Sequence, residues 1–267
     1  MILDHFRLDG RVALVTGAAR GLGQGIALGL AEAGADIVAL DRCTSDDTGA
    51  AVQALGRRFL QICCDLGEAT VADLDAVVTR AVAEMGRLDI LVNNAGIIRR
   101  APALEFSEAD WDDVIQINLK ALFFLSQAAA RQMVAQGGGG PSGIGAGPSG
   151  IGKIINTASM LYFQGGILVP SYTAAKSGVA GLTRALANEW ARHGINVNAI
   201  APGYMATDNT AALRADPARS QTILDRIPAG RWGVPADLQA AAVFLASSGA
   251  DYVHGAILCV DGGWMGR

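Results

Sequence analysis

The chain has 267 residues and a formal net charge of -4, with 51% hydrophobic and 17% charged residues. This length suits one large α/β domain, because such domains run to roughly 250 residues without dividing. The mild acidity and the lack of a long basic run argue against nucleic acid as a partner, and no apolar run has the length of a signal peptide or membrane span, so we expect no membrane association and a cytoplasmic protein.

Short apolar runs alternate along the chain with longer amphipathic segments. Seven runs lack strict two-residue alternation, as expected of strands covered on both faces; they span residues 11–16, 36–40, 59–64, 89–94, 153–159, 195–200 and 256–260. Helices are predicted at 21–33, 69–86, 107–136, 172–193 and 235–247, with a weaker one at 48–55. The pattern predicts a single α/β domain over residues 1–267. We expect a Rossmann-like, doubly wound parallel sheet of seven strands with helices on both faces, whose ligands bind beyond the carboxyl ends of the strands.

The first predicted strand runs directly into the glycine-rich stretch TGAARGLG, which opens the next helix. Gly17, Gly21 and Gly23 let the backbone turn tightly and approach a pyrophosphate. Unpaired N–H groups at the start of the helix meet the negative charge of such a ligand. An ordinary glycine-rich turn is the alternative, but its place between a strand and a helix favours a dinucleotide site.

An acidic residue, Asp41, stands eighteen residues after the last of these glycines, at the end of the second predicted strand. A carboxylate there binds both ribose hydroxyls and repels a 2'-phosphate, which favours NAD over NADP. Arg20 and Arg42 complicate this prediction, since either can neutralise a phosphate. Asp65 and Leu66 follow the third strand, where an adenine edge is read, although Asp65 can equally be a turn residue.

A tyrosine and a lysine, Tyr172 and Lys176, stand four residues apart in the stretch SYTAAKSG. This spacing puts both on one helix face, where a cation favours the phenolate form of the tyrosine. A partly buried tyrosine beside a solvated lysine is the alternative. Lysine is otherwise scarce, with only Lys120 and Lys153 elsewhere in the chain.

The cysteines Cys43, Cys63, Cys64 and Cys259 form no C-x-x-C motif, and no histidine stands at a metal-ligand spacing from them. We therefore expect buried free thiols and no metal site.

Residues 137–152 read GGGGPSGIGAGPSGIG and contain GPSGIG twice. A segment with nine glycines and two prolines cannot bury enough surface to order itself. We interpret it as a flexible insertion at the edge of the sheet opposite the candidate site.

Several motifs together resemble the short-chain dehydrogenase/reductases across essentially the whole chain. They are T-G-x-x-x-G-x-G, NNAG at residues 93–96, Asn118, Ser159, the pair Tyr172 and Lys176, and PG at residues 202–203. The resemblance implies a dinucleotide-dependent oxidoreductase. In it, Tyr172 exchanges a proton with the substrate oxygen while hydride passes to or from the nicotinamide ring.

The resemblance also implies roles for the neighbouring side chains. Lys176 lowers the pKa of the tyrosine and holds the ribose, while Ser159 binds the reacting oxygen. Asn118 binds a water that links Lys176 to solvent, although a helix-kink residue is an alternative or additional role for it. The implied cofactor contacts are Gly17, Arg20, Gly21, Leu22, Gly23, Asp41, Asp65, Leu66, Asn93, Ala95, Gly96, Tyr172, Lys176, Pro202, Gly203 and Thr207.

Longer segments, such as NTASMLYFQGGILVPSYTAAKSGV, are similar to a branch of the family that acts on six-carbon keto sugar acids in the breakdown of pectin-type uronic acids. An arginine can grip the carboxylate of such a substrate, although surface or interface arginines are an equally good reading of each. The candidates are Arg99, Arg100, Arg226 and Arg231. Met160, Gln164 and Met205 are candidate pocket walls, although methionines at such places are more often packing residues.

Other activities stay open at the level of the sequence. The same scaffold serves other carbonyls, as in gluconate 5-dehydrogenase or 3-oxoacyl carrier-protein reductase, and a nucleotide-binding regulator without turnover is a remote alternative. The resemblance further implies a homotetramer, in which the helices predicted at 107–136 and 172–193 form bundles between subunits.

Overall fold

The computed structural model describes residues 1–137 and 152–267. In this part of the chain, seven parallel strands form one sheet in the order β3-β2-β1-β4-β5-β6-β7. The strands are β1 (Val12–Thr16), β2 (Asp36–Asp41), β3 (Phe59–Cys63), β4 (Ile90–Asn93), β5 (Gly152–Thr157), β6 (Ile195–Pro202) and β7 (Ile257–Val260). The predicted doubly wound parallel sheet of seven strands is confirmed.

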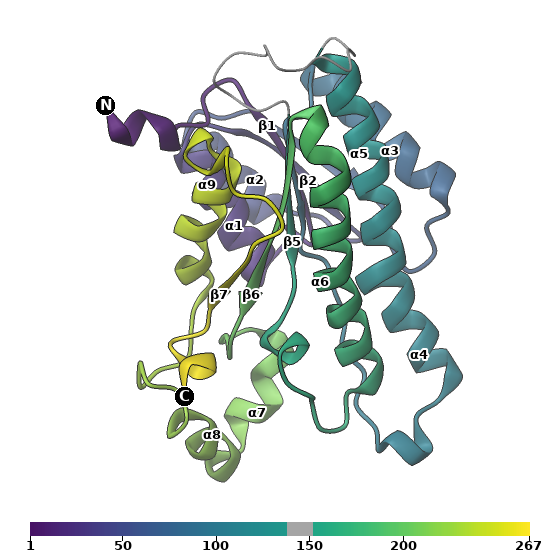
Figure 1. Ribbon diagram of the computed structural model, residues 1–267, viewed down its shortest axis with the longest axis vertical. Helices are drawn as coiled ribbons and strands as arrows, with labels where there is room; N and C mark the ends of the chain where they lie inside the picture. The colour runs from purple at the N-terminus through teal and green to yellow at the C-terminus, as the bar shows by residue number, and fades with distance from the viewer. Residues whose placement is uncertain (138–151) are drawn as a thin grey trace.

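Helices cover both faces of the sheet (Figure 1). One face carries α1 (Gly21–Glu32), α2 (Asp46–Ala54) and α9 (Gln239–Ala246), and the other carries α3 (Val71–Met85), α4 (Glu108–Ile115), α5 (Leu122–Gln136) and α6 (Pro170–Trp190). Successive residues of a strand point to opposite faces. Ala13 accordingly packs in the cluster beneath α1, whereas Leu14 packs in the cluster beneath α3 and α5. Burial on both sides explains why apolar and polar residues do not alternate along the strands.

The helix predicted over residues 107–136 is interrupted. Between α4 and α5 the structure has a π-helical segment, Gln116–Ala121, which contains the buried Asn118. A π-helical turn inserts extra backbone into a helix and is often found at functional sites. The prediction of one continuous α-helix is therefore wrong in its middle, and the interruption includes Asn118, the residue for which a helix-kink role was the alternative.

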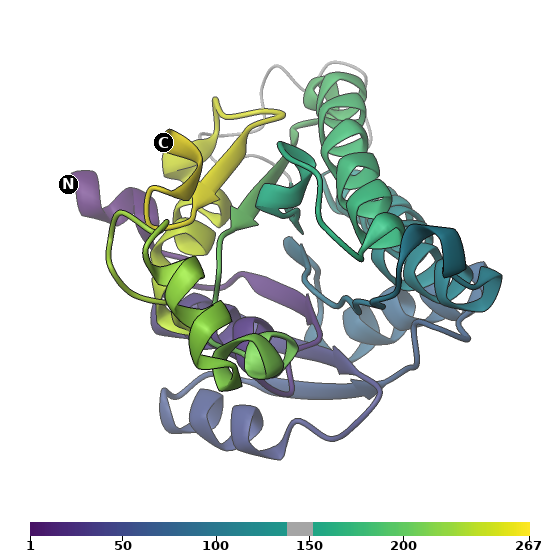
Figure 2. The same cartoon turned by 90° about the horizontal axis from the view of Figure 1, so that it is seen from below.

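Two short helices, α7 (Ala211–Ala215) and α8 (Pro217–Leu224), follow β6 and have no counterpart among the predicted elements. Pro217 stands at the first position of α8, and Asp216 accepts a hydrogen bond from the backbone N–H of Arg219, so the helix has both a favourable first residue and an N-cap. Seen from below in Figure 2, α7 and α8 lie at the end of the sheet where the strands point.

The cysteines differ from the expectation in one respect. All four are free, but Cys43 and Cys63 are exposed and Cys64 and Cys259 are only partly buried, so the prediction of buried thiols is wrong. Their positions at or near the ends of β2, β3 and β7 explain the exposure, because strand ends leave the covered interior. The expected flexible insertion at 137–152 lies, apart from its two end residues, outside the described residues.

Candidate active site

The turn between β1 and α1 requires its glycines. Gly17 has φ +67° and Gly21 has φ +60°, in the left-handed region that residues with a Cβ rarely adopt. A Cβ on Gly23 would stand 2.0 Å from the carbonyl oxygen of Gly17, so helix α1 packs on the turn only with glycine there. Gly23 thus allows the first turn of α1 to pack directly on the backbone of Gly17.

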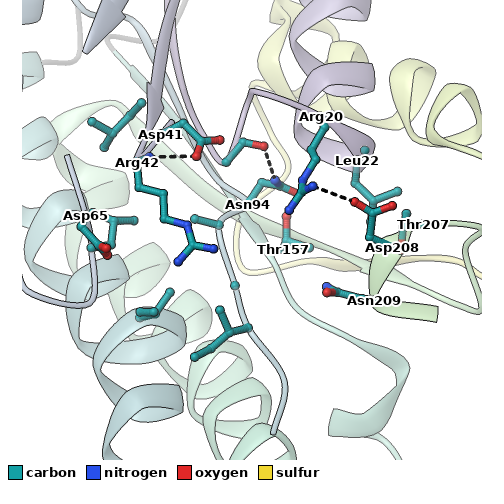
Figure 3. Close-up of a pocket in the computed structure, with 18 of the residues that line it drawn as sticks. Arg20, Leu22, Asp41, Arg42, Asp65, Asn94, Thr157, Thr207, Asp208 and Asn209 are labelled. Carbon is teal, nitrogen blue, oxygen red and sulfur yellow. Dashed lines mark hydrogen bonds and ion pairs between the residues drawn. The ribbon is translucent and has the colours of Figure 1, made fainter. Parts of the chain in front are cut away.

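A cavity of about 320 Å³ opens from this turn, beyond the carboxyl ends of the strands. In the sheet, β1 has β2 on one side and β4 on the other, so the direction in which strands are added reverses at β1. Doubly wound sheets bind their ligands at such a reversal, and the cavity lies there. Many of the predicted cofactor residues line it: Gly17, Arg20, Gly21, Leu22, Asp41, Asp65, Leu66, Ala95, Gly96, Tyr172, Lys176 and Thr207. Figure 3 shows Arg20, Leu22, Asp41, Asp65 and Thr207 among them.

The carboxylate of Asp41 is held against the glycine-rich turn. Its Oδ2 accepts a hydrogen bond of 3.0 Å from the backbone N–H of Ala19, and its Oδ1 accepts one of 2.8 Å from that of Arg42. The Arg42 side chain also lines the cavity (Figure 3). A carboxylate and a guanidinium therefore stand together at the end of β2.

Asn93 does not line the cavity, contrary to the prediction. Its amide donates 2.9 Å hydrogen bonds to the Ser126 hydroxyl and to Asn156 Oδ1 in the core. Alternation turns the next residue the other way, and Asn94 faces the cavity and binds the backbone oxygen of Thr16 at 3.1 Å. The structure therefore places the second asparagine of NNAG, and not the first, on the cavity wall.

Pro202 and Gly203 also lie outside the cavity lining, unlike Thr207. Gly203 continues the pairing with β7, since its N–H donates to the carbonyl of Val260 at 3.0 Å. A Cβ on Gly203 would stand 2.6 Å from Cα of Asp261, so this glycine permits a close backbone crossing. Contacts with a cofactor remain a prediction for these two residues.

Tyr172 and Lys176 both line the cavity and lie close together. Both project from α6, and the Lys176 ammonium lies 5.6 Å from the centre of the Tyr172 ring. Lys176 is buried, and its Nζ donates a 2.6 Å hydrogen bond to the carbonyl oxygen of Thr157 at the end of β5. Ser159 follows two residues later, where its hydroxyl accepts from the backbone N–H of Leu161 at 3.2 Å.

Burial dominates the protonation of this pair. It raises the pKa of Tyr172, while the neighbouring Ser159 hydroxyl and the positive charge of Arg100 act in the opposite direction. Burial also lowers the pKa of Lys176 to about 8. The Lys176 ammonium donates its hydrogen bond to Thr157, and the lowering of the tyrosine pKa by Lys176 remains a prediction.

Asn118 connects the π-helical segment to the loop after β4. Its Oδ1 accepts from the backbone N–H of Ile97 and its Nδ2 donates to the carbonyl of Ile97, each at 2.9 Å. A Cβ on Gly96 would lie 3.0 Å from Asn118 Oδ1 and 3.8 Å from Lys176 Nζ. Asn118 therefore holds the loop close to the lysine; its part in a proton relay remains a prediction.

Two of the four candidate substrate arginines have carboxylate partners within the chain. Arg99 forms ion pairs with Asp110 at 3.1 Å and with Asp113 at 2.9 Å. Arg231 binds both carboxylate oxygens of Asp237, each at 2.7 Å. A substrate carboxylate would have to compete with these aspartates for either guanidinium.

The other two, Arg100 and Arg226, have no carboxylate partner within the described ranges. Arg100 donates a 3.1 Å hydrogen bond to the carbonyl of Asn209, which lines the cavity. Arg226 lies 4.3 Å over the ring of Trp264 and approaches Gln164 Oε1 at 3.5 Å.

The two candidate methionines are buried packing residues. Met160 lies in a small cluster with Ile223, Ile227 and Trp264, next to Ser159 in the chain. Met205 belongs to the large core cluster on the α1 side. Neither methionine lines the cavity. Nothing in the structure supports Met205 as a substrate wall, and the prediction for Met160 rests only on its place next to Ser159 in the chain.

Several residues line the cavity without having been predicted: Leu40, Cys64, Asn94, Ile97, Ile117, Thr157, Asp208 and Asn209. Some carry a signal in the sequence, because Leu40, Cys64 and Thr157 stand at or beside the carboxyl ends of predicted strands. Asp208 and Asn209 follow Thr207 directly, so extending that motif by two residues finds them.

The family described as short chain dehydrogenase matches residues 11–218. The chain belongs to this family. As a short-chain dehydrogenase it is an oxidoreductase, which confirms the resemblance drawn from its motifs. Within the described ranges, no helix of this short-chain dehydrogenase combines the length and apolar character of a membrane span.

Three relatives show how close the similarity is. The chain is 61% identical to 2-dehydro-3-deoxy-D-gluconate 5-dehydrogenase of Escherichia coli (strain K12) and 60% identical to that of Dickeya dadantii (strain 3937), in both cases over 100% of each chain. A crystal structure of a putative 2-deoxy-D-gluconate 3-dehydrogenase from Agrobacterium tumefaciens with bound NADP is 56% identical. It superposes with a TM-score of 0.88 over 98% of this chain and 99% of that one.

Proposed function

We propose that this short-chain dehydrogenase interconverts a ketone and a secondary alcohol on a six-carbon keto sugar acid, of the type 2-dehydro-3-deoxy-D-gluconate, with a nicotinamide dinucleotide. One observation carries the proposal: a single cavity is lined both by the glycine-rich turn and by Tyr172 and Lys176. Full-length relatives at 61% and 60% identity that bear this name support the substrate class.

The residues around the turn fit a dinucleotide. A Cβ on Gly17 would lie 3.1 Å from Cα of Ala95, so glycine lets the turn pack closely against the loop after β4. The N-terminus of α1 begins at Gly21 and presents unpaired N–H groups to a diphosphate. When bound, the cofactor supplies or accepts the hydride; the residues of the chain supply orientation and the proton.

The proton is moved by Tyr172. In the direction of ketone reduction, its hydroxyl donates a proton to the oxygen as negative charge develops there, and the Ser159 hydroxyl hydrogen-bonds the same oxygen. The buried ammonium of Lys176 stabilises the phenolate that remains. Asn118 supports the pair through its hold on the loop at Ile97.

We propose NAD as the preferred cofactor, with NADP also accepted. Asp41 stands at the end of β2, where a carboxylate binds the ribose hydroxyls and disfavours a 2'-phosphate. Arg42 lines the same part of the cavity and offers a positive charge to such a phosphate. The relative from Agrobacterium tumefaciens has NADP bound, which supports tolerance of both dinucleotides.

We assign the substrate carboxylate to Arg100. Its guanidinium donates a 3.1 Å hydrogen bond to the carbonyl of Asn209, which lines the same cavity as Tyr172, and its positive charge opposes the rise that burial causes in the pKa of Tyr172. Among the four candidate arginines, Arg99 and Arg231 are neutralised by aspartates, and Arg226 is stacked on Trp264. Arg100 binds only a backbone carbonyl among the described residues, which leaves its charge available.

We also propose that the chain works as a cytoplasmic homotetramer, as its family resemblance implies. Trp111, on α4, is 41% exposed, which suits an interface at the helices of that face. Light scattering of the purified protein tests this assembly.

The activity is tested by steady-state assays with NADH and NADPH against keto sugar acids, with D-gluconate included in the oxidative direction. We expect the wild type to reduce 2-dehydro-3-deoxy-D-gluconate-type substrates, and Tyr172→Phe to lose about 10²-fold or more of kcat while still binding the dinucleotide. Turnover of a carrier-protein ketone alone would refute the substrate class. Dinucleotide binding without any turnover would favour a regulator.

A further inference from the structure

An ion pair crosses the cofactor cavity. Arg20 Nη1, in the glycine-rich turn, lies 3.0 Å from Oδ2 of Asp208, and both residues line the cavity (Figure 3). Each side chain remains 74% exposed, so the pair is solvated and exchanges its partners readily. It joins the start of α1 to the loop after β6.

The position of Arg20 gives this pair its significance. Arg20 is the residue directly before α1, so its guanidinium stands beside the positive end of that helix. A phosphate that binds there attracts Arg20 and repels the carboxylate of Asp208. The two anions therefore need the same cation.

We propose that Asp208 competes with a phosphate of the bound dinucleotide for Arg20, and that this competition weakens cofactor binding and speeds cofactor release. The inference rests on the proposed function, because it requires a dinucleotide in this cavity. Asp208 sets affinity through Arg20 and takes no part in the proton transfer at Tyr172.

The loop that carries Asp208 has other anchors. The Thr210 hydroxyl donates to the carbonyl of Met205, and Arg214 donates to the carbonyl of Thr207 at 3.1 Å. Removing the charge of Asp208 thus leaves the loop attached, and a change in cofactor affinity reports on the ion pair. Asp112, an exposed residue of α4 with no side-chain partner among the described residues, offers a matched control for the loss of one negative charge.

The test is a fluorescence titration of NADH and NADPH into wild type, Asp208→Asn, Arg20→Gln and the double variant. Asp208→Asn is expected to tighten binding about twofold to fivefold, the range of an exposed ion pair, with a matching fall in the cofactor dissociation rate. The gain disappears in the Arg20→Gln background, and Asp112→Asn binds like wild type. Tightening of both dinucleotides identifies the competing group as the diphosphate, and tightening of NADPH alone identifies it as the 2'-phosphate.

Two results would overturn the inference while leaving the proposed function intact: unchanged or weaker binding by both Asp208→Asn and Asp208→Ser, or an equal gain in the Arg20→Gln background, which would indicate general charge repulsion. If the wild type binds neither dinucleotide, the proposed function fails as well.

Discussion

The ammonium of Lys176 donates a 2.6 Å hydrogen bond to the carbonyl oxygen of Thr157, at the end of the neighbouring strand β5. This contact fixes a buried cation 5.6 Å from the centre of the Tyr172 ring. The helix therefore supplies the spacing of the pair, and the sheet supplies the anchor. The pair is thus positioned where α6 meets the carboxyl end of β5.

The pH dependence of ketone reduction should reflect this lysine. Burial lowers the pKa of Lys176 to about 8, so its ammonium is present below that pH and lost above it. Because the cation stabilises the phenolate formed when Tyr172 gives up its proton, kcat/KM for reduction should fall as pH rises through about 8. Steady-state rates between pH 6 and 10 measure this fall in kcat/KM, because the range extends about two pH units on each side of the lysine pKa.

The matched variant is Lys176→Arg. A guanidinium stays protonated throughout this range, so the fall in kcat/KM should shift to higher pH even if the maximal rate is reduced. A fall that stays near pH 8 in this variant would assign the titration to another group.

Replacing Arg100 should affect the substrate and spare the cofactor. Loss of a charge-assisted hydrogen bond costs about 1.5–3 kcal/mol, so Arg100→Gln should raise the KM for the keto sugar acid roughly 10-fold to 100-fold with little change in the dinucleotide KM. Arg99→Gln is the control, since that guanidinium is already paired with Asp110 and Asp113. Equal KM values for the wild type and the Arg100 variant would move the carboxylate to Arg226.

Asp41 and Arg42 should control the choice of dinucleotide in opposite directions. Asp41→Asn removes the negative charge but keeps an oxygen for the backbone N–H of Ala19, so the turn should persist while the ratio of kcat/KM for NADH over NADPH falls about tenfold. Arg42→Gln should raise that ratio. A ratio that responds to neither variant would show that the cavity selects its cofactor elsewhere.

Local sequence patterns predicted the elements that are set by burial and spacing. Leu14 and its neighbours in β1 are apolar on both sides because helices cover both faces, and the four-residue interval of Tyr172 and Lys176 follows from the helical repeat. The π-helical turn at Asn118 escaped prediction because its apolar pattern continues that of α4 and α5. In the structure the turn coincides with two hydrogen bonds between Asn118 and Ile97, a tertiary contact that a local sequence pattern does not show.

It was harder to predict which way a side chain points where a shift of one residue along the strand reverses the answer. Asn93 and Asn94 are chemically identical, and only the end of β4 at Asn93 decides which of them faces the core. The candidate arginines present the same difficulty. Arg99 looks free in the sequence, yet α4 brings Asp110 to it at 3.1 Å.

The glycine at position 23 provides a steric test of the cofactor site. A Cβ there would stand 2.0 Å from the Gly17 oxygen and 2.5 Å from Asn94 Nδ2, so Gly23→Ala must push α1 away from the turn. We expect a loss of about 1–3 kcal/mol in the free energy of unfolding. Because the turn no longer presents its N–H groups together, the dinucleotide Kd should rise at least about tenfold.

Gly181→Ala in α6 is the matched control for this change. A Cβ on Gly181 meets no atom within 4 Å, so alanine should be neutral or stabilise the helix by about 0.5–1 kcal/mol while the dinucleotide Kd stays at the wild-type value. Denaturant unfolding and dinucleotide titration of both variants make the comparison. Wild-type affinity in Gly23→Ala would mean that the dinucleotide does not approach this turn, because no rearrangement of side chains alone removes a 2.0 Å contact with a backbone oxygen.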